Sequence, residues 1–227
     1  MKKVDKEGKG YMIVSYIEGD SVENELTYLS ESEQFQIGLE SGKELKRIHQ
    51  YRAPNNIEPW FNRKLEKHKK YVDQYLATSI RFHQDKVILS FIEENIKFMK
   101  GRPNLFQHDD FHIGNIIVKN GKLAGIIDFN SHDWGDPVHE FIKIGMFSRQ
   151  KSISFCIGQI LGYHDKTEPP ESFWILYSLY LAMCLFSSVV WSLKFIPEEV
   201  DCMLNKIYTV IDDHNSFKSI KPSWYKI

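Results

Sequence analysis

Residues 105–137 read LFQHDDFHIGNIIVKNGKLAGIIDFNSHDWGDP, and this stretch decides the fold. Two runs rich in Ile and Val, 115–118 and 123–129, lie on either side of Asn120-Gly121. Asn-Gly readily takes the positive φ angles of a tight turn whose twist matches that of two paired strands. The sequence therefore predicts a β-hairpin in the second half of this stretch.

Oxygen-bearing side chains lie at both ends of this hairpin. Folding brings Asn115, at the start of one strand, near Asp128, at the end of the other. Asp110 lies in the polar loop before the hairpin, and this loop follows a short strand predicted at 105–107. Hard cations such as Mg²⁺ prefer oxygen ligands and are often held by one or two carboxylates plus the phosphates of a substrate. We therefore expect these three side chains to converge at one end of a small sheet.

The order and spacing of the polar residues carry a resemblance to a known family. The motif reads His108-x-Asp110-x-x-x-x-Asn115, then Ile126-Ile127-Asp128-Phe129, then Gly135-Asp136-Pro137. It resembles the catalytic loop and metal-binding Asp of the aminoglycoside phosphotransferase and choline-kinase-like family, which has a protein-kinase-like fold. By that resemblance Asp110 orients or deprotonates the acceptor hydroxyl, and Asn115 and Asp128 hold Mg²⁺. His108 and Asp136 are expected to support the loop structurally.

Two positions depart from the family pattern. The family usually has Gly between the His and the Asp, where this chain has Asp109, and often Leu where this chain has Phe111. A purely structural interpretation is that Asp110 and Asn115 are turn residues, because Asp and Asn side chains bond nearby backbone. That interpretation explains either residue alone, but not the ordered set with its hairpin and Gly-Asp-Pro.

The apolar segment 11–17, YMIVSYI, predicts a strand, the second of a hairpin whose turn includes Gly8 and Gly10. In the resembled family this strand leads into the hinge between two lobes, where backbone groups bond the nucleotide base. The resemblance therefore implies that the base of ATP or GTP binds at Ser15, Tyr16, Ile17 and Glu18.

The resemblance covers nearly all of this chain but only the C-terminal part of the family. We interpret residues 1–20 as a remnant strand or hairpin with the hinge, and residues 21–227 as a helical catalytic-type lobe. The glycine-rich phosphate loop and Lys that precede the hinge in the family have no counterpart before it here. Because phosphoryl transfer depends on positioning and charge neutralisation, we expect a lone chain to be slow. A second copy or a separate N-lobe chain is expected to cover the open, apolar cleft.

Apolar periodicity predicts that most of the remaining chain is helical. Helices are expected at 30–50, 58–77, 84–100, 138–148, 153–161, 173–193 and from Pro197 onward. The segment 173–193 has no charged residue and is long enough to span a bilayer, but its serines and lack of a basic flank favour a buried central helix. The predicted fold class is α+β and mainly helical: the C-terminal lobe of a protein-kinase-like fold, with a small β-hairpin at the catalytic site and a short N-terminal strand or hairpin.

Apolar spacing also predicts which side chains face inward. Val87 is expected to do so, and the Lys-rich stretch 64–70 is interpreted as a solvated helix face rather than a phosphate-binding patch. Glu140 is expected to be solvated or salt-bridged rather than catalytic. The helix at 58–77 is expected to bury Phe61, Leu65, Val72 and Leu76.

The overall composition limits the class of function. The chain has 227 residues and is 42% hydrophobic, enough for a substantial core. Its 29 basic and 30 acidic residues leave a formal net charge of −1, so charge indicates neither a nucleic-acid partner nor a membrane. The three cysteines are widely spaced and no signal peptide is evident, which indicates reduced thiols in a cytoplasmic protein.

Three functions remain open on the sequence alone. The leading one is a nucleotide-dependent phosphotransferase acting on a hydroxyl of a small molecule, such as an aminoglycoside-like compound or another sugar or amino alcohol. The second is a catalytically inactive kinase-like lobe that binds a ligand and needs a partner chain. The third is a metal phosphohydrolase, because His108-Asp109 resembles an HD pair. The resembled aminoglycoside enzymes hold cationic sugars with C-terminal acids, which this chain offers as Asp165, Glu168, Glu171, Glu198, Glu199, Asp201, Asp212 and Asp213.

Overall fold

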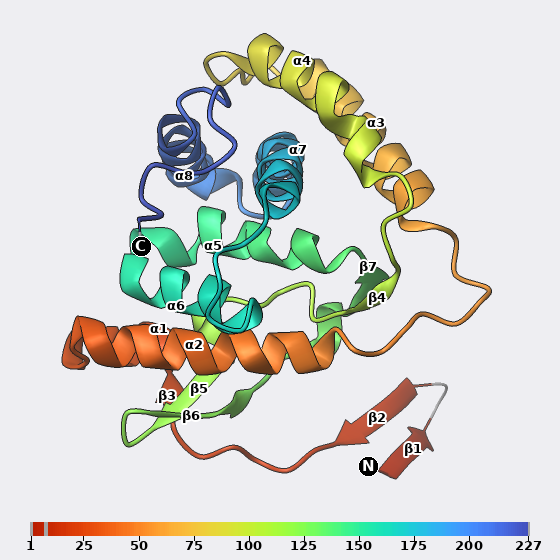
Figure 1. Ribbon diagram of the computed structural model, residues 1–227. Coiled ribbons are helices and arrows are strands. Elements are labelled where there is room, and N and C mark those ends of the chain that lie inside the picture. The colour runs from red at the N-terminus through yellow and green to blue at the C-terminus, as the bar shows by residue number, and fades with distance from the viewer. Residues whose placement is uncertain (1, 7–8, 227) are drawn as a thin grey trace.

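Helices make up most of the molecule, and small sheets lie along one side of it (Figure 1). The structure, a computed structural model, describes residues 2–6 and 9–226. Its α-helices are α1 (Val22–Glu25), α2 (Glu31–Ile48), α3 (Trp60–Ala77), α4 (Asp85–Asn95), α5 (Ile142–Met146), α6 (Ile153–Tyr163), α7 (Glu171–Phe195) and α8 (Val200–Asp213). Short 3₁₀ helices are η1 (Leu26–Tyr28), η2 (Ile96–Met99), η3 (Ile113–Asn115), η4 (Phe129–Ser131), η5 (Pro137–Phe141), η6 (Ser148–Gln150) and η7 (Pro197–Glu199). The strands are β1 (Lys2–Lys6), β2 (Lys9–Ile13), β3 (Asp20–Ser21), β4 (Leu105–Gln107), β5 (Ile116–Lys119), β6 (Lys122–Ile126) and β7 (Asp133–Gly135).

The expected hairpin is confirmed. Strands β5 and β6 pair antiparallel, and Asn120 and Gly121 at their turn have φ angles of 54° and 70°. Two further pairings were not predicted from the sequence: β3 joins the free edge of β5, and β4 pairs with β7. The β4–β7 pair fixes the strand before the polar loop against the segment that leads into Gly135.

The N-terminal strand ends earlier than the predicted range 11–17. Strand β2 ends at Ile13, and residues 14–18 have no regular structure. Its partner β1 is described from Lys2, which pairs with Ile13, so the described part of the ladder stops there. A hairpin of β1 and β2 is confirmed. Gly8, expected in its turn, lies outside the described residues, whereas the same expectation for Gly10 is wrong because Gly10 lies in β2 and pairs with Asp5.

Helix α7 is the buried centre of the helical layers, as expected. Within its most apolar window 72% of residues are buried, and in Figure 1 it lies between α3 and α8. By length and composition alone this helix could cross a membrane. The burial of most of its residues inside the protein accounts for the same apolar composition in a different way, as the core of a globular fold.

The inward face of α3 differs from the prediction. The buried side chains are Trp60, His68 and Tyr75, whereas Leu76 is 50% exposed, and so is Val87 at the start of α4. The stripe that packs against α7 consists of amphipathic aromatic residues, and two of them, Trp60 and Tyr75, also form hydrogen bonds through their polar atoms. One such contact is from the indole nitrogen of Trp60 to the hydroxyl of Tyr180, 2.9 Å away on α7.

Helices α2 and α6 pack backbone against backbone through glycines. A Cβ built at any of four positions would lie 2.0 to 2.2 Å from a backbone oxygen of the opposite helix. Real Cβ atoms do not approach oxygen so closely, so only Gly allows this packing. The four residues are spaced i, i+4 on each helix: Gly38 and Gly42 on α2, and Gly158 and Gly162 on α6.

Replacing Gly42 by Ala tests this packing. Helix propensity alone favours Ala over Gly by about 1 kcal/mol. The new Cβ, however, would lie 2.1 Å from the carbonyl oxygen of Gln159, and separating two helix backbones costs roughly 1–3 kcal/mol. We expect Gly42→Ala to lower the free energy of unfolding measured by denaturant titration. The neighbouring exposed substitution Lys43→Ala should change it by no more than about 0.5 kcal/mol, and equal stability of both variants would contradict the proposed packing constraint.

Candidate active site

The polar loop between β4 and β5 is anchored by His108. This side chain is fully buried, and its Nε2 lies 2.7 Å from the carbonyl oxygen of Ile127 at the end of β6. Its Nδ1 accepts a hydrogen bond from the backbone N–H of Asp110 at 3.2 Å. Both ring nitrogens are therefore bonded within the protein, which joins the loop to the far end of the hairpin. The contacts leave His108 no free nitrogen for a metal, contrary to what an HD-type phosphohydrolase needs.

Glu140 supports the same loop from the other side. It is 1% exposed, so the expectation of a solvated side chain is wrong. Its carboxylate accepts hydrogen bonds from the backbone N–H groups of Asp109 (3.2 Å) and Phe111 (3.4 Å). The carboxylate also lies 3.5 Å from Nε2 of His49 at the end of α2. This contact corresponds to the other expected role for Glu140, that of a salt-bridged side chain. Buried N–H groups need acceptors, so Glu140 fixes the loop backbone on both sides of Asp110.

Asp109 occupies the position at which the family usually has Gly, and its backbone explains that preference. Its φ angle is +62°, in the left-handed region that glycine adopts without steric cost. The side chain enters a cavity beside the loop, where Oδ1 lies 3.6 Å from Nδ1 of His139. Burial, together with the negative charge of Glu140, raises the pKa of Asp109 to about 6.

Asp110 is held as an anion by three neighbours. Its Oδ2 lies 3.7 Å from Nε2 of His112 and 3.2 Å from Nδ2 of Asn115, and its Oδ1 lies 2.7 Å from Nζ of Lys143 on α5. The contacts with His112 and Lys143 hold the pKa of Asp110 well below its usual value, although partial burial opposes them. Burial of Lys143 disfavours its charge, but the bond to Asp110 outweighs this and its pKa is raised. No pattern in the sequence singles out Lys143.

Asn115 and Asp128 lie next to each other across the open end of the hairpin. The N–H of Ile127 donates to the carbonyl oxygen of Asn115 at 3.0 Å, and Asp128 follows in a left-handed conformation with φ +65°. Because the Asn115 amide nitrogen bonds to the carbonyl oxygen and the carboxylate of Asp110, its Oδ1 remains available as a ligand. The exposed Asp128 carboxylate, bonded to Asn130 at 2.7 Å, is the second oxygen donor.

This donor set suits a hard cation that brings other ligands with it. Among residues 2–6 and 9–226 no group of three or more His, Cys, Asp or Glu side chains could hold a metal ion alone. Mg²⁺ is usually held by one or two protein oxygens plus phosphates and water, so Asn115 and Asp128 match its requirements when a nucleotide is also bound.

Asp136 is a fully buried carboxylate with a complete set of partners. It receives hydrogen bonds from Nε and a terminal nitrogen of Arg102 (2.6 and 2.8 Å), the hydroxyl of Tyr180 (2.7 Å) and the N–H of Val138 (3.1 Å). The bond to Asp136 raises the pKa of Arg102 despite burial. Asp136 thus connects the end of the loop region to α7.

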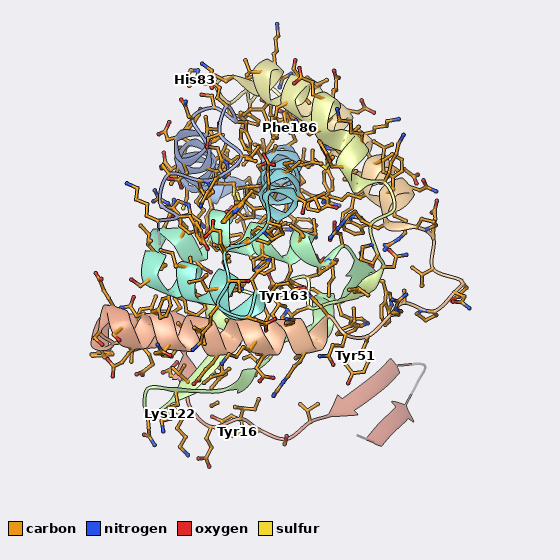
Figure 2. All side chains as sticks on the ribbon, viewed as in Figure 1. Tyr16, Tyr51, His83, Lys122, Tyr163 and Phe186 are labelled. Atoms are coloured by element: carbon orange, nitrogen blue, oxygen red, sulfur yellow. The ribbon has the colours of Figure 1, made fainter. Side chains whose placement is uncertain are left out.

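The four residues expected to bind the base lie along the edge of the β5–β6 hairpin. Ile17 packs against Gly125 of β6, and Glu18 forms an ion pair with Lys119 of β5. Tyr16 is 85% exposed, and Figure 2 shows it on the same lower edge of the molecule as Lys122. Ser15 is also exposed.

A cavity of about 640 Å³ lies beside Asp109 and Asp110, with further walls from α3, α5, α7 and α8. Lys64 of α3 enters it, so the interpretation of 64–70 as an entirely solvated face is wrong. Its Nζ lies 2.7 Å from Nε2 of His139, and burial lowers the pKa of Lys64 to about 8. The position of Lys64, one helical turn from both Trp60 and His68, follows the buried stripe of α3.

Comparison with known proteins gives one family and one fold. The model of the phosphotransferase enzyme family (APH) matches residues 2–174. A gentamicin complex of the aminoglycoside phosphotransferase APH(2")-IIa is 14% identical with a TM-score of 0.60, covering 94% of this chain and 74% of that one. ADP-bound APH(2'')-Ib is 18% identical with a TM-score of 0.58, covering 90% and 74%. A choline/ethanolamine kinase family protein from Mesorhizobium loti is 12% identical with a TM-score of 0.69, covering 96% and 76%.

Comparison with curated proteins gave no match. The solved structures confirm the expected fold, a mainly helical α+β lobe of the kinase-like type. At 12 to 18% identity these three structures establish the fold, while the acceptor of this chain has to be argued from its own residues.

The raised pKa of Asp109 gives a pH-dependent stability prediction. Between the ordinary carboxyl pKa of 3.8 and about 6 the folded protein binds more protons than the unfolded chain, so this residue costs stability as pH rises. Asp109→Asn removes the charge and retains a residue tolerant of positive φ. At pH 7.5 we expect the variant to be more stable than the wild type by up to about 3 kcal/mol, with the difference vanishing near pH 4.

Denaturant titrations from pH 4 to 8 measure this difference. Asp73→Asn, which removes an exposed carboxylate from α3, is the control and should show no comparable pH-dependent gain. A gain for Asp109→Asn that stays constant from pH 4 to 8 would mean that removal of the buried charge is not its cause.

Proposed function

This chain belongs to the phosphotransferase enzyme family, and from that premise we propose that it transfers a phosphoryl group from ATP or GTP to a hydroxyl of a small molecule. The observation that carries the proposal is the position of Asp110. Its carboxylate, held in the ionised form, faces a cavity of about 640 Å³, within the size range of small-molecule sites. Asn115, bonded to the same carboxylate through its amide nitrogen, keeps its amide oxygen available as a ligand.

In the proposed reaction Asp110 orients the acceptor hydroxyl and accepts its proton. A carboxylate with so low a pKa is a weak base, so it cannot remove the proton before the phosphoryl group is transferred. Phosphoryl transfer passes through a loose transition state in which the hydroxyl becomes acidic late, so orientation contributes more than basicity. Lys143 is the positioning residue, because its bond to Oδ1 fixes the rotation of the carboxylate.

Asn115 and Asp128 would hold Mg²⁺, which neutralises phosphate charge when it is bound with the nucleotide. The irregular segment 14–18 supports a base site, because the backbone groups of residues 15–18 make no backbone hydrogen bonds to described residues. Such groups are free to bond a nucleotide base. The similar solved structures include both ADP and GDP complexes, so both nucleotides belong in the test.

One observation favours a second function, a kinase-like lobe that binds ligands without catalysis. Both carboxylate oxygens of Asp110 already have partners, Lys143 on Oδ1 and Asn115 on Oδ2. A catalytic Asp110 must therefore share an oxygen with the acceptor hydroxyl. Carboxylate oxygens accept more than one hydrogen bond, so this arrangement is compatible with catalysis. The same contacts of Asp110 are equally expected in a lobe that binds ligands without catalysis.

Calorimetric titration of MgATP and MgGTP, followed by phosphoryl-transfer assays on hydroxyl compounds, tests the proposal. We expect Asp128→Asn to weaken nucleotide binding in Mg²⁺, because it removes the charged oxygen donor. Asp110→Asn should bind nucleotide normally and lose about 10²–10⁴-fold in kcat, because it cannot accept the proton. Asp73→Asn should behave as the wild type in both assays.

The outcomes separate the two functions. Nucleotide binding without transfer to any acceptor, unchanged in Asp110→Asn, would support the binding lobe. Absence of nucleotide binding by the wild-type chain would count against phosphoryl transfer by the chain on its own, and against a binding lobe whose ligand is a nucleotide.

A further inference from the structure

The walls of the cavity beside Asp110 carry an unusual set of charges. Lysines come from three different helices: Lys64 and Lys67 on α3, Lys143 on α5 and Lys206 on α8. The carboxylates that line it are Asp109, Asp110 and Glu199. In Figure 1, α7 lies between α3 and α8, the two helices that carry Lys67 and Lys206.

The lysines differ in how far their charge is compensated inside the protein. Lys143 is paired with Asp110, and Lys64 contacts the uncharged acceptor nitrogen of His139. Across the described residues, no carboxylate lies within ion-pair distance of Lys67 or Lys206. Lys67, which is exposed, and Lys206, which is half-buried, thus line the cavity without an ion-pair partner.

The cations also crowd one another. Burial is the main cause of the lowered pKa of His139 and of Lys64; the charges of Lys64, Lys67 and Lys143 lower that of His139 further, and the charge of Lys67 lowers that of Lys64 further. On the other side, Lys143 and Lys206 lie 5.4 and 5.0 Å from the same ring, that of Phe147. Like charges gathered in a concave site raise the local concentration of anions and favour an anionic ligand.

We infer that the acceptor of this site carries an anionic group, a carboxylate or a phosphate, which Lys67 and Lys206 bind while its hydroxyl reaches Asp110. The inference rests on the proposed phosphotransferase function and specifies the acceptor class. Charge-assisted hydrogen bonds from Lys to such a group are among the stronger polar contacts in proteins. Ser187 and Ser188 of α7, which also line the cavity, offer hydroxyls to the rest of the acceptor.

The same walls disfavour a polycationic sugar. Of the eight C-terminal acids that a cationic acceptor would use, Glu199 is the one that lines the cavity, and it is exposed on η7. A polyamine in the site would face four lysines, Lys64, Lys67, Lys143 and Lys206, against three acids, of which Asp110 is already paired with Lys143. Placing like charges together is a means of rejecting a ligand, so the lysines exclude cationic acceptors as well as attracting anionic ones.

The test measures acceptor binding directly, without nucleotide, by calorimetry and saturation-transfer NMR on the full chain. Four probes differ in charge: D-glycerate with a carboxylate, glycerol 3-phosphate with a phosphate, glycerol with neither, and cationic gentamicin. We expect at least one of the two anionic probes to bind, and glycerol and gentamicin to bind at least tenfold more weakly. Whichever anionic probe binds shows whether the carboxylate or the phosphate is the preferred group. The affinity for that probe should fall as salt is added.

We expect Lys67→Gln and Lys206→Gln each to lower the affinity for the anionic probe about tenfold or more, the usual effect of losing a charge-assisted hydrogen bond. Lys69→Gln is the matched control, because Lys69 is exposed on the same helix as Lys67 and does not line the cavity. It should bind as the wild type does. Thermal unfolding of all three variants verifies that they are folded.

Three results would overturn the inference: neither anionic probe binds the wild type, gentamicin binds as well as or better than the anions, or Lys67→Gln and Lys206→Gln bind the anion like Lys69→Gln. Failure of the proposed function gives a different pattern. A chain that binds an anion through these lysines but neither binds nucleotide nor transfers phosphate would keep the anion site and reject the phosphotransferase.

Discussion

The buried carboxylate of Asp136 is the constraint on which the arrangement of this lobe depends. An unpaired buried charge is very costly, so Asp136 requires Arg102, Tyr180 and the N–H of Val138 all to be in place. These partners belong to the segment before β4, to α7 and to η5. Through Tyr180 the network extends to Trp60 at the start of α3. The relative positions of strand, loop and two cavity walls are thus set by one charge.

A second constraint acts on the loop itself. Glu140, three residues after Pro137, accepts two loop N–H groups, while His108 ties the loop to the end of β6. The loop is therefore held from η5 on one side and from the hairpin on the other. Residues that must present a carboxylate accurately are usually supported in this way, because a loop alone leaves its side chains too free.

Local signals in the sequence predicted much of the fold. Asn120-Gly121 determines its turn by backbone conformation alone, and the uncharged run of α7 indicated its burial. Strands β3, β4 and β7, with two or three residues each, are too short for a periodic signal, although β4 was predicted from its apolar residues. The glycine pairs of α2 and α6 were visible at i, i+4 spacing but are informative only once the two helices are known to meet.

In the candidate site, too, the residues brought together by tertiary contacts could not be predicted from the sequence. Asp110, Asn115 and Asp128 were found because their spacing is part of one continuous stretch, and their proposed roles remain to be tested. Lys64 and Lys143 were missed because docking of separate helices brings them to the loop. Glu140 lies close to the motif in the sequence but was expected to be solvated or salt-bridged. Lys64 was further hidden by a buried stripe made of Trp60, His68 and Tyr75, in which aromatic and polar residues replace the aliphatic pattern expected of a core face.

Adjacent acids in opposite environments are the physical reason for assigning different roles to Asp109 and Asp110. The same loop turn directs them to different neighbours, so burial and Glu140 raise the pKa of Asp109 to about 6 while His112 and Lys143 lower that of Asp110. Sites in which the pKa values of two carboxyl groups are shifted in opposite directions commonly divide acid, base or orienting roles between the two groups. Asp110 is the permanent anion and suits the orientation of a hydroxyl. Asp109 adds a negative charge to the cavity only above about pH 6, which makes the balance between its acids and its lysines depend on pH.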